Sequence, residues 1–248
     1  MPGRSDPALQ SQAHRTVSRV ATILETAAAT PDGVRLTDVA KVLDAPKSSV
    51  HGLLRGLVAV GYLEDRNGRF TVGRALHSLL AVSERPSLAE VGHDLMVELR
   101  EELQETVVLG HRMGDSIVYF HAVESLQLIK YSAQLNQRRP VYPTSMGKIY
   151  LADLPDRELE EYLAHHVKSK RQRQAALDDL RQVRRTRVAI NRNQTLPGLF
   201  GAAAGIRERG ELVACLSVVG PTDRMGRQSR KIVAAVRAAA DHLTGLLD

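Results

Sequence analysis

The stretch KSSVHGLLRGLVAVGYLEDRNGRFTVG, residues 47–73, decides the fold class of the N-terminal part of the chain. Its first half carries apolar residues at the three- and four-residue spacing of one helix face. These residues are Val50, Leu53, Leu54, Leu57 and Val58. Its second half contains two short extended segments around Asn67 and Gly68, a dipeptide that favours tight hairpin turns. Because Pro46 suits the first turn of a helix, the stretch predicts a helix followed by a β-hairpin.

Two more helical patterns precede this stretch. Between His14 and Ala29 apolar residues recur with helical spacing, and TPDG at residues 30–33 ends the run. The segment LTDVAKVLDA, residues 36–45, has a short apolar face, and Thr37 is its expected N-cap. Three helices, with a tight turn between the last two and a hairpin after them, predict a winged helix-turn-helix domain.

Such a domain is expected to contact double-stranded DNA through the outer face of its third helix. Polar and basic residues of the pattern lie on that face, where they can donate hydrogen bonds to bases or phosphates. Two arginines of the hairpin are placed to touch the DNA backbone or the minor groove. The predicted DNA-contacting residues are Thr37, Lys47, Ser48, Ser49, His51, Arg55, Arg66 and Arg69.

The bulk properties bound the remaining possibilities. A length of 248 residues is enough for two domains with a core each, and a net charge of +6 is compatible with a polyanionic partner. A basic run between Lys168 and Arg192 is interpreted as a solvated helix face. The N-terminus lacks a hydrophobic signal core and no apolar run is long enough for a membrane span, so a cytoplasmic protein without a membrane partner is expected. The single cysteine, Cys215, and the spacing of the histidines predict neither a disulfide framework nor a metal site.

The segment PTSMGK, residues 143–148, admits two interpretations. Ser145 and Lys148 are spaced S-x-x-K, the pattern in which a lysine activates a nucleophilic serine, although the S-D-N and K-T-G segments that accompany it in penicillin-binding enzymes are missing. Alternatively, Pro143 and Thr144 end an extended segment, and Ser145 begins a helix whose first amides form a cradle for an anion. The segment taken alone is compatible with both a serine acyl hydrolase and an anion-binding site.

Residues 86–248 alternate helical and extended patterns. Helices are expected at residues 88–103, 145–154, 156–164, 175–186 and 228–247. Strands are expected on both sides of the MGDS turn within residues 105–125, at residues 126–135, and at residues 198–206 and 212–220 around the RERG turn. Helices that flank an antiparallel sheet describe an α+β domain.

These motifs identify a resemblance to a known family. Residues 14–73 are similar to the N-terminal domain of the IclR family of bacterial transcriptional regulators, including its L-T-x-[VIL]-A and P-K-S-[ST]-V-H signatures. The segment ALHSLLAVSERP, residues 75–86, matches the linker helix of the family, and the similarity extends over about residues 14–246. Gly52 stands where the family often has an arginine, which removes one expected DNA contact.

The resemblance implies a fold and a division into domains. It implies an α+β chain with a flexible N-terminal arm at residues 1–13, a winged helix-turn-helix domain at residues 14–73 and a linker helix at residues 74–85. Residues 86–248 would form a GAF-like effector-binding and oligomerisation domain, an antiparallel sheet flanked by helices.

The resemblance also implies a function. It implies a ligand-responsive regulator of a catabolic operon, with no enzymatic activity and no cofactor, that binds a palindromic operator as a homodimer or homotetramer. Its effector would be a small organic carboxylate held by the first amides of the helix that begins in PTSMGK. The alternatives are a serine acyl hydrolase built on Ser145 and Lys148 and a DNA-binding protein without an effector.

Several pocket positions of the family differ in this sequence. Asn191–Gln194 replace an acidic stretch, Gly201 replaces a cysteine, and Val219 replaces the second serine of L-S-V-S-G-P, whereas Ser217 is kept. The pocket is therefore expected to be less acidic, larger and more apolar, which favours an aromatic or longer acyl carboxylate. The expected effector-binding residues are Tyr131, Ser145, Met146, Gly147, Lys148, Asn191, Asn193, Gly201, Ser217 and Val219.

Overall fold

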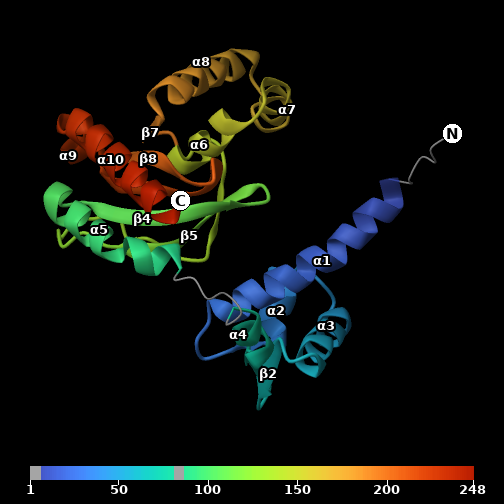
Figure 1. Ribbon diagram of the computed structural model, residues 1–248. Coiled ribbons are helices and arrows are strands. Elements are labelled where there is room, and N and C mark those ends of the chain that lie inside the picture. The colour runs from blue at the N-terminus through green and yellow to red at the C-terminus, as the bar shows by residue number, and fades with distance from the viewer. Residues whose placement is uncertain (1–6, 81–86) are drawn as a thin grey trace. The chain divides into compact units, whose positions relative to one another are not determined.

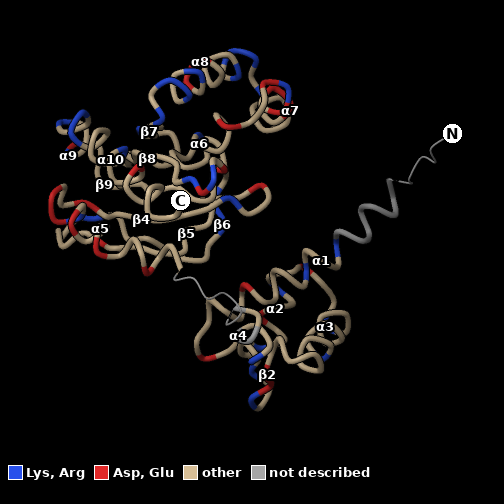
Figure 2. The backbone as a smooth tube through the Cα atoms, viewed as in Figure 1, with Lys and Arg blue, Asp and Glu red and all other residues tan. Residues whose placement is uncertain are grey.

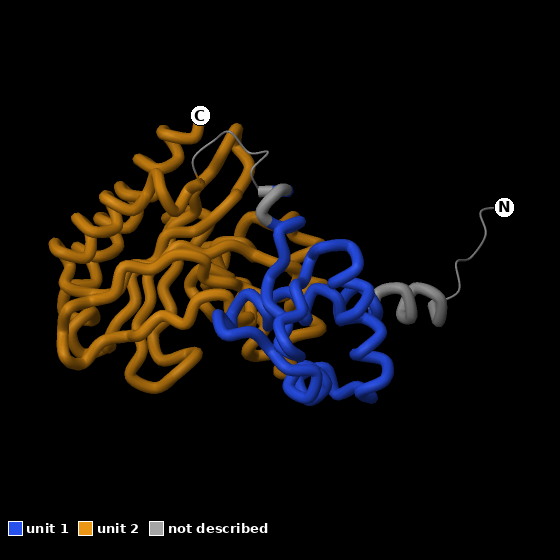
Figure 3. The backbone as a smooth tube through the Cα atoms, turned by 90° about the horizontal axis from the view of Figure 1, so that it is seen from below, with its two compact units in different colours: residues 1–86 blue, residues 87–248 orange. Residues whose placement is uncertain are grey.

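The computed structural model of the chain describes residues 7–80 and 87–248 (Figure 1). Its backbone divides into two compact units, residues 1–86 and residues 87–248 (Figure 3). Each unit has its own hydrophobic core. None of the helices in the described part of the chain combines the length and the apolar character that crossing a membrane requires.

The N-terminal unit is a winged helix-turn-helix domain. Its elements are α1 (Pro7–Ala28), β1 (Val34–Arg35), α2 (Leu36–Val42), α3 (Lys47–Ala59), β2 (Leu63–Arg66), β3 (Arg69–Val72) and α4 (Arg74–Leu80). Ile23 of α1, Leu54 of α3 and Phe70 of β3 belong to one buried cluster that joins the helices to the sheet. Asn67 and Gly68 both have positive φ, as the tight turn between β2 and β3 requires, so the predicted wing is confirmed.

The boundaries of this unit differ from the expected ones in three places. The first helix begins at Pro7, well before His14, so residues 7–13 of the expected arm are helical; a proline is compatible with the first turn of a helix. The N-cap of α2 is Arg35, because β1 pairs with β3 and the chain passes from strand directly into helix. Thr37 therefore lies inside the first turn rather than at the cap, and its hydroxyl donates to Asp38. Of the expected linker helix, α4 covers residues 74–80, and residues 81–85 lie outside the described residues.

The C-terminal unit is an antiparallel sheet flanked by helices, which confirms the expected fold class. Its strands are β4 (Thr106–Met113), β5 (Ser116–Val123), β6 (Arg138–Pro140), β7 (Val188–Arg192), β8 (Leu199–Glu208) and β9 (Glu211–Pro221), in the order β6-β5-β4-β9-β8-β7. Its helices are α5 (Leu88–Leu103), α6 (Ser145–Asp153), α7 (Asp156–His166), α8 (Lys170–Thr186), α9 (Thr222–Arg227) and α10 (Ser229–Leu247).

Both faces of this sheet are covered. Successive side chains of a strand point to opposite faces, and the central strand β9 shows the consequence. Leu216 belongs to a buried cluster with residues of α5 and α10, whereas Cys215 belongs to a cluster with residues of α6, α7 and α8. Figure 1 shows α6, α7 and α8 together on the side of the sheet away from α5. Cys215 is thus a fully buried core residue.

One expected strand does not form. Residues 126–135 are an irregular loop, in which Leu126, Leu128 and Ile129 are exposed. Side chains hold the loop in place of a strand ladder, because the Thr106 hydroxyl donates to the carbonyl of Tyr131 at 2.6 Å and the Glu124 carboxylate accepts from the hydroxyl of Ser132 at 2.7 Å. An apolar pattern alone therefore gave the wrong assignment. Conversely, the short elements β7 and α9 were not expected, and α8 begins at Lys170, before the first apolar residue of its pattern.

A forked ion pair fastens α9 to the sheet. Glu105 is only 3% exposed and precedes β4, and the guanidinium of Arg224 donates to its two carboxylate oxygens at 2.7 and 2.9 Å. The same guanidinium donates to the carbonyl of Ile129 at 2.9 Å, which ties the irregular loop to α9. The hydrogen bonds from Arg224 to Glu105 raise the pKa of the arginine above its usual value. Arg224 therefore joins three segments that are distant in the sequence.

We expect Arg224→Met to lower the free energy of unfolding of the C-terminal unit by about 1.5 to 3 kcal/mol, because the buried carboxylate of Glu105 loses its charge-assisted partners. Urea denaturation followed by circular dichroism measures the change. The matched control is Arg230→Met, an exposed arginine on α10, whose effect should stay within about 0.5 kcal/mol. An equal loss in both variants would show that the fork does not stabilise the unit.

Candidate functional site

The first candidate site is the outer face of α3. Val50, Leu54 and Leu57 are buried on its inner face. The expected DNA-contacting residues of this helix are all exposed; they are Lys47, Ser48, Ser49, His51 and Arg55. One helix face is thus committed to the core, and the opposite face presents hydroxyl, imidazole and cationic groups to solvent.

The remaining expected DNA-contacting residues lie outside α3, and the two arginines among them have partners within the unit. Thr37 is exposed on α2, and Arg66 on the hairpin pairs with Glu64 at 2.9 Å. Arg69 donates from Nη1 to the carbonyl of Gly33 at 3.1 Å, which ties β3 to the loop after α1. Figure 2 shows acidic and basic positions close together on this hairpin, so its cations are partly offset by carboxylates.

The second candidate site is a cavity of about 310 Å³ in the C-terminal unit. It lies where the start of α6 meets the sheet and the loop between β7 and β8. Its lining residues are Tyr119, Tyr131, Arg139, Pro140, Pro143, Thr144, Ser145, Asn191, Gln194, Thr195, Leu196, Leu199, Gly201 and Val219. Five of the expected effector-binding residues are in this set: Tyr131, Ser145, Asn191, Gly201 and Val219.

The start of α6 lies at this cavity and has two backbone amides without a partner inside the helix. Thr144 is the N-cap; its hydroxyl accepts from the amide of Gly147 at 3.1 Å, and its carbonyl accepts from the amide of Lys148 at 3.0 Å. The amides of Ser145 and Met146 have no hydrogen-bond partner among the residues that the structure describes. The expected anion cradle is therefore narrower than Ser145 to Lys148, because Ser145 is the one residue of this stretch that both lines the cavity and keeps an unpartnered amide.

Arg139 supplies the positive charge of the cavity wall. Its guanidinium carbon lies 4.0 Å from the centre of the Tyr119 ring, and its Nη atoms donate to the carbonyls of Gln137 and Gln134 at 2.9 and 2.7 Å. Burial raises the pKa of Tyr119 above its usual value, so the phenol stays neutral. Stacking on a neutral aromatic ring and the two carbonyl contacts hold this half-buried guanidinium in place. None of the residues that line the cavity is acidic, so no carboxylate of the wall competes for it.

Lys148 does not face the cavity. Its side chain is 1% exposed, and its ammonium contacts the Asp179 carboxylate at 2.6 Å, the Ile190 carbonyl at 2.7 Å and the Gln194 side-chain oxygen at 2.7 Å. These partners occupy the three donors of an ammonium group. The side-chain contact of Ser145 is instead with Ser217, at 3.3 Å between the hydroxyl oxygens. The lysine is thus neither a base beside Ser145 nor a cation directed at a ligand, and the S-x-x-K spacing has a structural cause.

Gly147 also has a structural role rather than a contact with the cavity. A Cβ atom at this position would lie 1.7 Å from the carbonyl oxygen of Val141 and 2.7 Å from the hydroxyl oxygen of Thr144. The close approach allows the N-cap and the preceding loop to fold against the helix. The sequence placed Gly147 among the effector-binding residues, but its close contact is with the chain itself.

Three further expected residues lie behind the cavity wall. Met146 is 1% exposed in the core below α6, and Ser217 donates from its hydroxyl to the carbonyl of Ala202 at 2.8 Å. The side-chain oxygen of Asn193 accepts from the amide of Gly198 at 2.9 Å and from the hydroxyl of Thr222 at 2.8 Å, which fixes the loop after β7. These residues shape the cavity without lining it.

Gly201 and Val219 do line the cavity, side by side on paired strands. A Cβ atom at Gly201 would lie 3.1 Å from the hydroxyl oxygen of Ser145 and 3.8 Å from the side chain of Val219. The absence of a side chain at Gly201 therefore allows the hydroxyl of Ser145 to approach β8 closely.

The most informative residues of the wall were not predicted. Tyr119 and Arg139 come from the paired strands β5 and β6, and Leu196 and Leu199 come from the loop after β7 and the start of β8. Tyr119 could have been found from the sequence, because it lies in an expected strand whose side chains alternate between the two faces of the sheet. Arg139 carried no such signal, because the sequence predicted no strand at residues 138–140.

Comparison with protein-family descriptions gives two matches on this chain. Residues 80–244 match the family "Bacterial transcriptional regulator IclR C-terminal", and residues 16–66 match "IclR helix-turn-helix domain". The chain belongs to the IclR family. It is accordingly a DNA-binding transcriptional regulator of the IclR type, and the resemblance seen in the sequence is confirmed.

Individual relatives agree with the family. The chain is 29% identical to the HTH-type transcriptional regulator BhcR of Paracoccus denitrificans over 245 residues, covering 94% of this chain and 87% of that protein. It is also 29% identical to the glycerol operon regulatory protein of Streptomyces griseus over 244 residues, covering 91% and 93%. The fold is similar, with a TM-score of 0.74 at 22% identity, to that of an IclR homologue from Microbacterium hydrocarbonoxydans complexed with 4-hydroxybenzoate, covering 93% of this chain and 98% of that one.

We expect Gly147→Ala to lower the free energy of unfolding by about 1 to 3 kcal/mol or more, because its Cβ atom would force the carbonyl of Val141 away. The matched control is Gly245→Ala on α10, where a Cβ atom meets nothing within 4 Å and alanine should stabilise the helix by up to about 1 kcal/mol. Thermal and urea unfolding of both variants measure the difference. A Gly147→Ala protein as stable as the Gly245→Ala protein would remove this role of Gly147.

Proposed function

We propose that this IclR-type regulator senses a small organic carboxylate in the cavity at the start of α6, with a preference for an aromatic acid. The observation that carries the proposal is the arrangement of Arg139 and the unpartnered helix-start amide of Ser145 around a cavity wall without an acidic residue. A carboxylate accepts two or more hydrogen bonds and is favoured at the positive end of a helix dipole. The remaining lining residues are suited to contact the apolar part of such a ligand.

The rest of the cavity supports an aromatic ligand. Tyr119 and Tyr131 provide aromatic rings, and Leu196, Leu199 and Val219 provide aliphatic contacts. A volume of about 310 Å³ is at the lower end of the usual range for ligand sites, roughly 300 to 1,000 Å³. These properties favour a compact acid with one ring over a small hydroxylated acid, which would leave the apolar walls without contacts. 4-Hydroxybenzoate, the ligand of the Microbacterium protein, is therefore the first compound to test.

The proposal extends to the DNA. We propose that a homodimer or homotetramer binds a palindromic operator of a catabolic operon, with one α3 in the major groove of each half-site. Two-fold symmetry of the operator then matches two-fold symmetry of the protein, as is usual for helix-turn-helix regulators. Lys47 and Arg55 are the strongest candidates for contact, because both are exposed cations on the outer face of α3.

The ligand prediction concerns Arg139. We expect Arg139→Met to weaken binding of the best aromatic carboxylate by about tenfold or more, because a charge-assisted hydrogen bond is lost. Calorimetric titration with 4-hydroxybenzoate, and with related benzoates if another binds better, measures the affinity. The matched control is Arg138→Met, its neighbour on β6, which does not line the cavity and should leave affinity unchanged.

Two outcomes would contradict the ligand proposal. One is equal affinity of the Arg138 and Arg139 variants for the carboxylate. The other is binding of 4-hydroxybenzamide, the neutral analogue, as tightly as 4-hydroxybenzoate, since an arginine and a helix N-terminus discriminate by charge.

The DNA prediction concerns α3. With an operator selected in vitro from random duplexes, Lys47→Ala and Arg55→Ala should each weaken binding by about 1 to 3 kcal/mol where a base is contacted. A phosphate contact would instead give a uniform loss across sequences and a shallower dependence on salt. Arg157→Ala on α7, in the other unit, is the control. Operator affinity unchanged in both α3 variants would exclude α3 as the recognition helix.

A further inference from the structure

Two histidines that are distant in the sequence meet on the α5 side of the C-terminal sheet. His93 lies on α5, and His121 lies on β5, 28 positions further along the chain. Nδ1 of His93 and Nε2 of His121 are 3.0 Å apart, and the two ring centroids are 5.2 Å apart. The spacing in the sequence gave no indication of this pair, because only the packing of α5 along β4 and β5 brings the rings together (Figure 1).

A β-bulge in β5 directs His121 toward α5. The register between β4 and β5 shifts by one residue, which leaves Phe120 without an opposite residue on β4. In a regular strand Tyr119 and His121 would point to the same face of the sheet. Here Tyr119 belongs to the buried cluster with α6, α7 and α8, whereas His121 contacts His93 of α5. Bulges that redirect a side chain in this way are frequent beside functional sites.

The separation of the two nitrogens is that of neighbouring ligands on one metal ion. Bonds between a metal ion and imidazole nitrogen are about 2.0 to 2.1 Å long, so two such nitrogens at a right angle or at the tetrahedral angle lie roughly 2.8 to 3.4 Å apart. The observed distance of 3.0 Å falls within this range. An ion can therefore replace the hydrogen bond between the rings with little movement of either nitrogen.

The protons of the pair permit this exchange. In a hydrogen bond between two neutral imidazoles one ring donates and the other accepts, whereas a metal ion needs a lone pair on both nitrogens. The donating ring must therefore transfer its proton to its own second nitrogen through water. Neither Nε2 of His93 nor Nδ1 of His121 has a hydrogen-bond partner in the part of the chain that the structure describes, so either can carry that proton. His93 is exposed, which gives water and ions access to the pair.

The ligands indicate the kind of ion. Imidazole suits Zn²⁺, Cu²⁺ and Ni²⁺, whereas Mg²⁺ and Ca²⁺ prefer oxygen ligands. Within residues 7–80 and 87–248 no group of three or more His, Cys, Asp or Glu side chains is placed to hold a metal ion. The pair is therefore a site with two protein ligands, and water occupies the remaining coordination positions. Such an open site binds an ion reversibly, unlike a closed structural site with four protein ligands.

We propose that His93 and His121 form a binding site for a divalent transition-metal ion, with Zn²⁺ as the first ion to test. The ion joins α5 to β5 through Nδ1 of His93 and Nε2 of His121, and water completes its coordination. Neither histidine lines the cavity that we assign to a carboxylate, so the two sites are separate.

The test is a calorimetric titration of the full-length protein, freed of metal by dialysis against a chelator, with zinc chloride in one arm and magnesium chloride in the other. We expect His93→Gln and His121→Gln each to weaken Zn²⁺ binding by about tenfold or more, because one of the two protein ligands is lost. The matched control is His242→Gln, an exposed histidine on α10 of the same unit, which should retain the affinity of the parent. Mg²⁺ should not bind at this site.

Thermal unfolding adds a second measurement. An ion that binds only the folded protein raises the unfolding temperature. Zn²⁺ should therefore raise it for the parent and for His242→Gln, but not for His93→Gln or His121→Gln, and circular dichroism without metal verifies that each variant is folded. Zn²⁺ bound no more tightly than Mg²⁺, or equal Zn²⁺ affinity in the His121→Gln and His242→Gln variants, would overturn the proposal.

Discussion

The buried ammonium of Lys148 is the interaction on which the C-terminal unit depends. Removing a charge from water costs several kcal/mol unless the charge is paired and fully hydrogen-bonded. Lys148 meets this condition through Asp179 of α8, the carbonyl of Ile190 in β7 and the side chain of Gln194. The three contacts fix α6 relative to α8, to the edge strand and to the loop that lines the carboxylate cavity. The same contacts that hold α6 therefore also fix the position of Gln194 in the cavity wall.

Much of the fold was predictable because it depends on local patterns. Helical spacing and the Asn67–Gly68 turn predicted the winged helix-turn-helix domain, and alternation predicted four of the sheet strands. The errors occurred where a partner distant in the sequence decides the structure. The apolar residues 126–135 look like a strand, but hydrogen bonds from Thr106 and to Glu124 hold them as a loop. No feature of residues 126–135 themselves distinguishes a strand from a loop.

The candidate site was predictable to a similar degree. The spacing of Ser145 and Lys148 was visible, but the direction of the lysine side chain depends on Asp179 and Ile190, which lie on other elements. Gly147 was expected to bind the effector, yet its close contact is with the carbonyl of Val141. Sequence therefore identified the region of the cavity, whereas the choice of lining residues required the packing of β5, β6 and the loop after β7.

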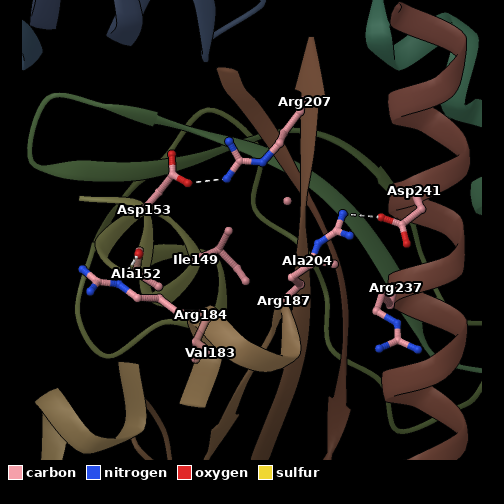
Figure 4. Close-up of a pocket in the computed structure, with 11 residues that line it drawn as sticks. Ile149, Ala152, Asp153, Val183, Arg184, Arg187, Ala204, Arg207, Arg237 and Asp241 are labelled. Carbon is pink, nitrogen blue, oxygen red and sulfur yellow. Dashed lines mark hydrogen bonds and ion pairs between the residues drawn. The ribbon is translucent and has the colours of Figure 1, made fainter. Parts of the chain in front are cut away.

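The two ends of α6 differ in polarity. The helix carries partial positive charge at its first amides and partial negative charge at its last carbonyls. Ser145 at its start lines the cavity that we assign to a carboxylate, and Ala152 and Asp153 at its end line another cavity, of about 140 Å³ (Figure 4). The carbonyls at that end attract cations, and Arg184 donates to two of them, at Ala152 and Leu154. The negative end of the helix thus binds a guanidinium of the fold, whereas its positive end faces the cavity that we assign to a carboxylate.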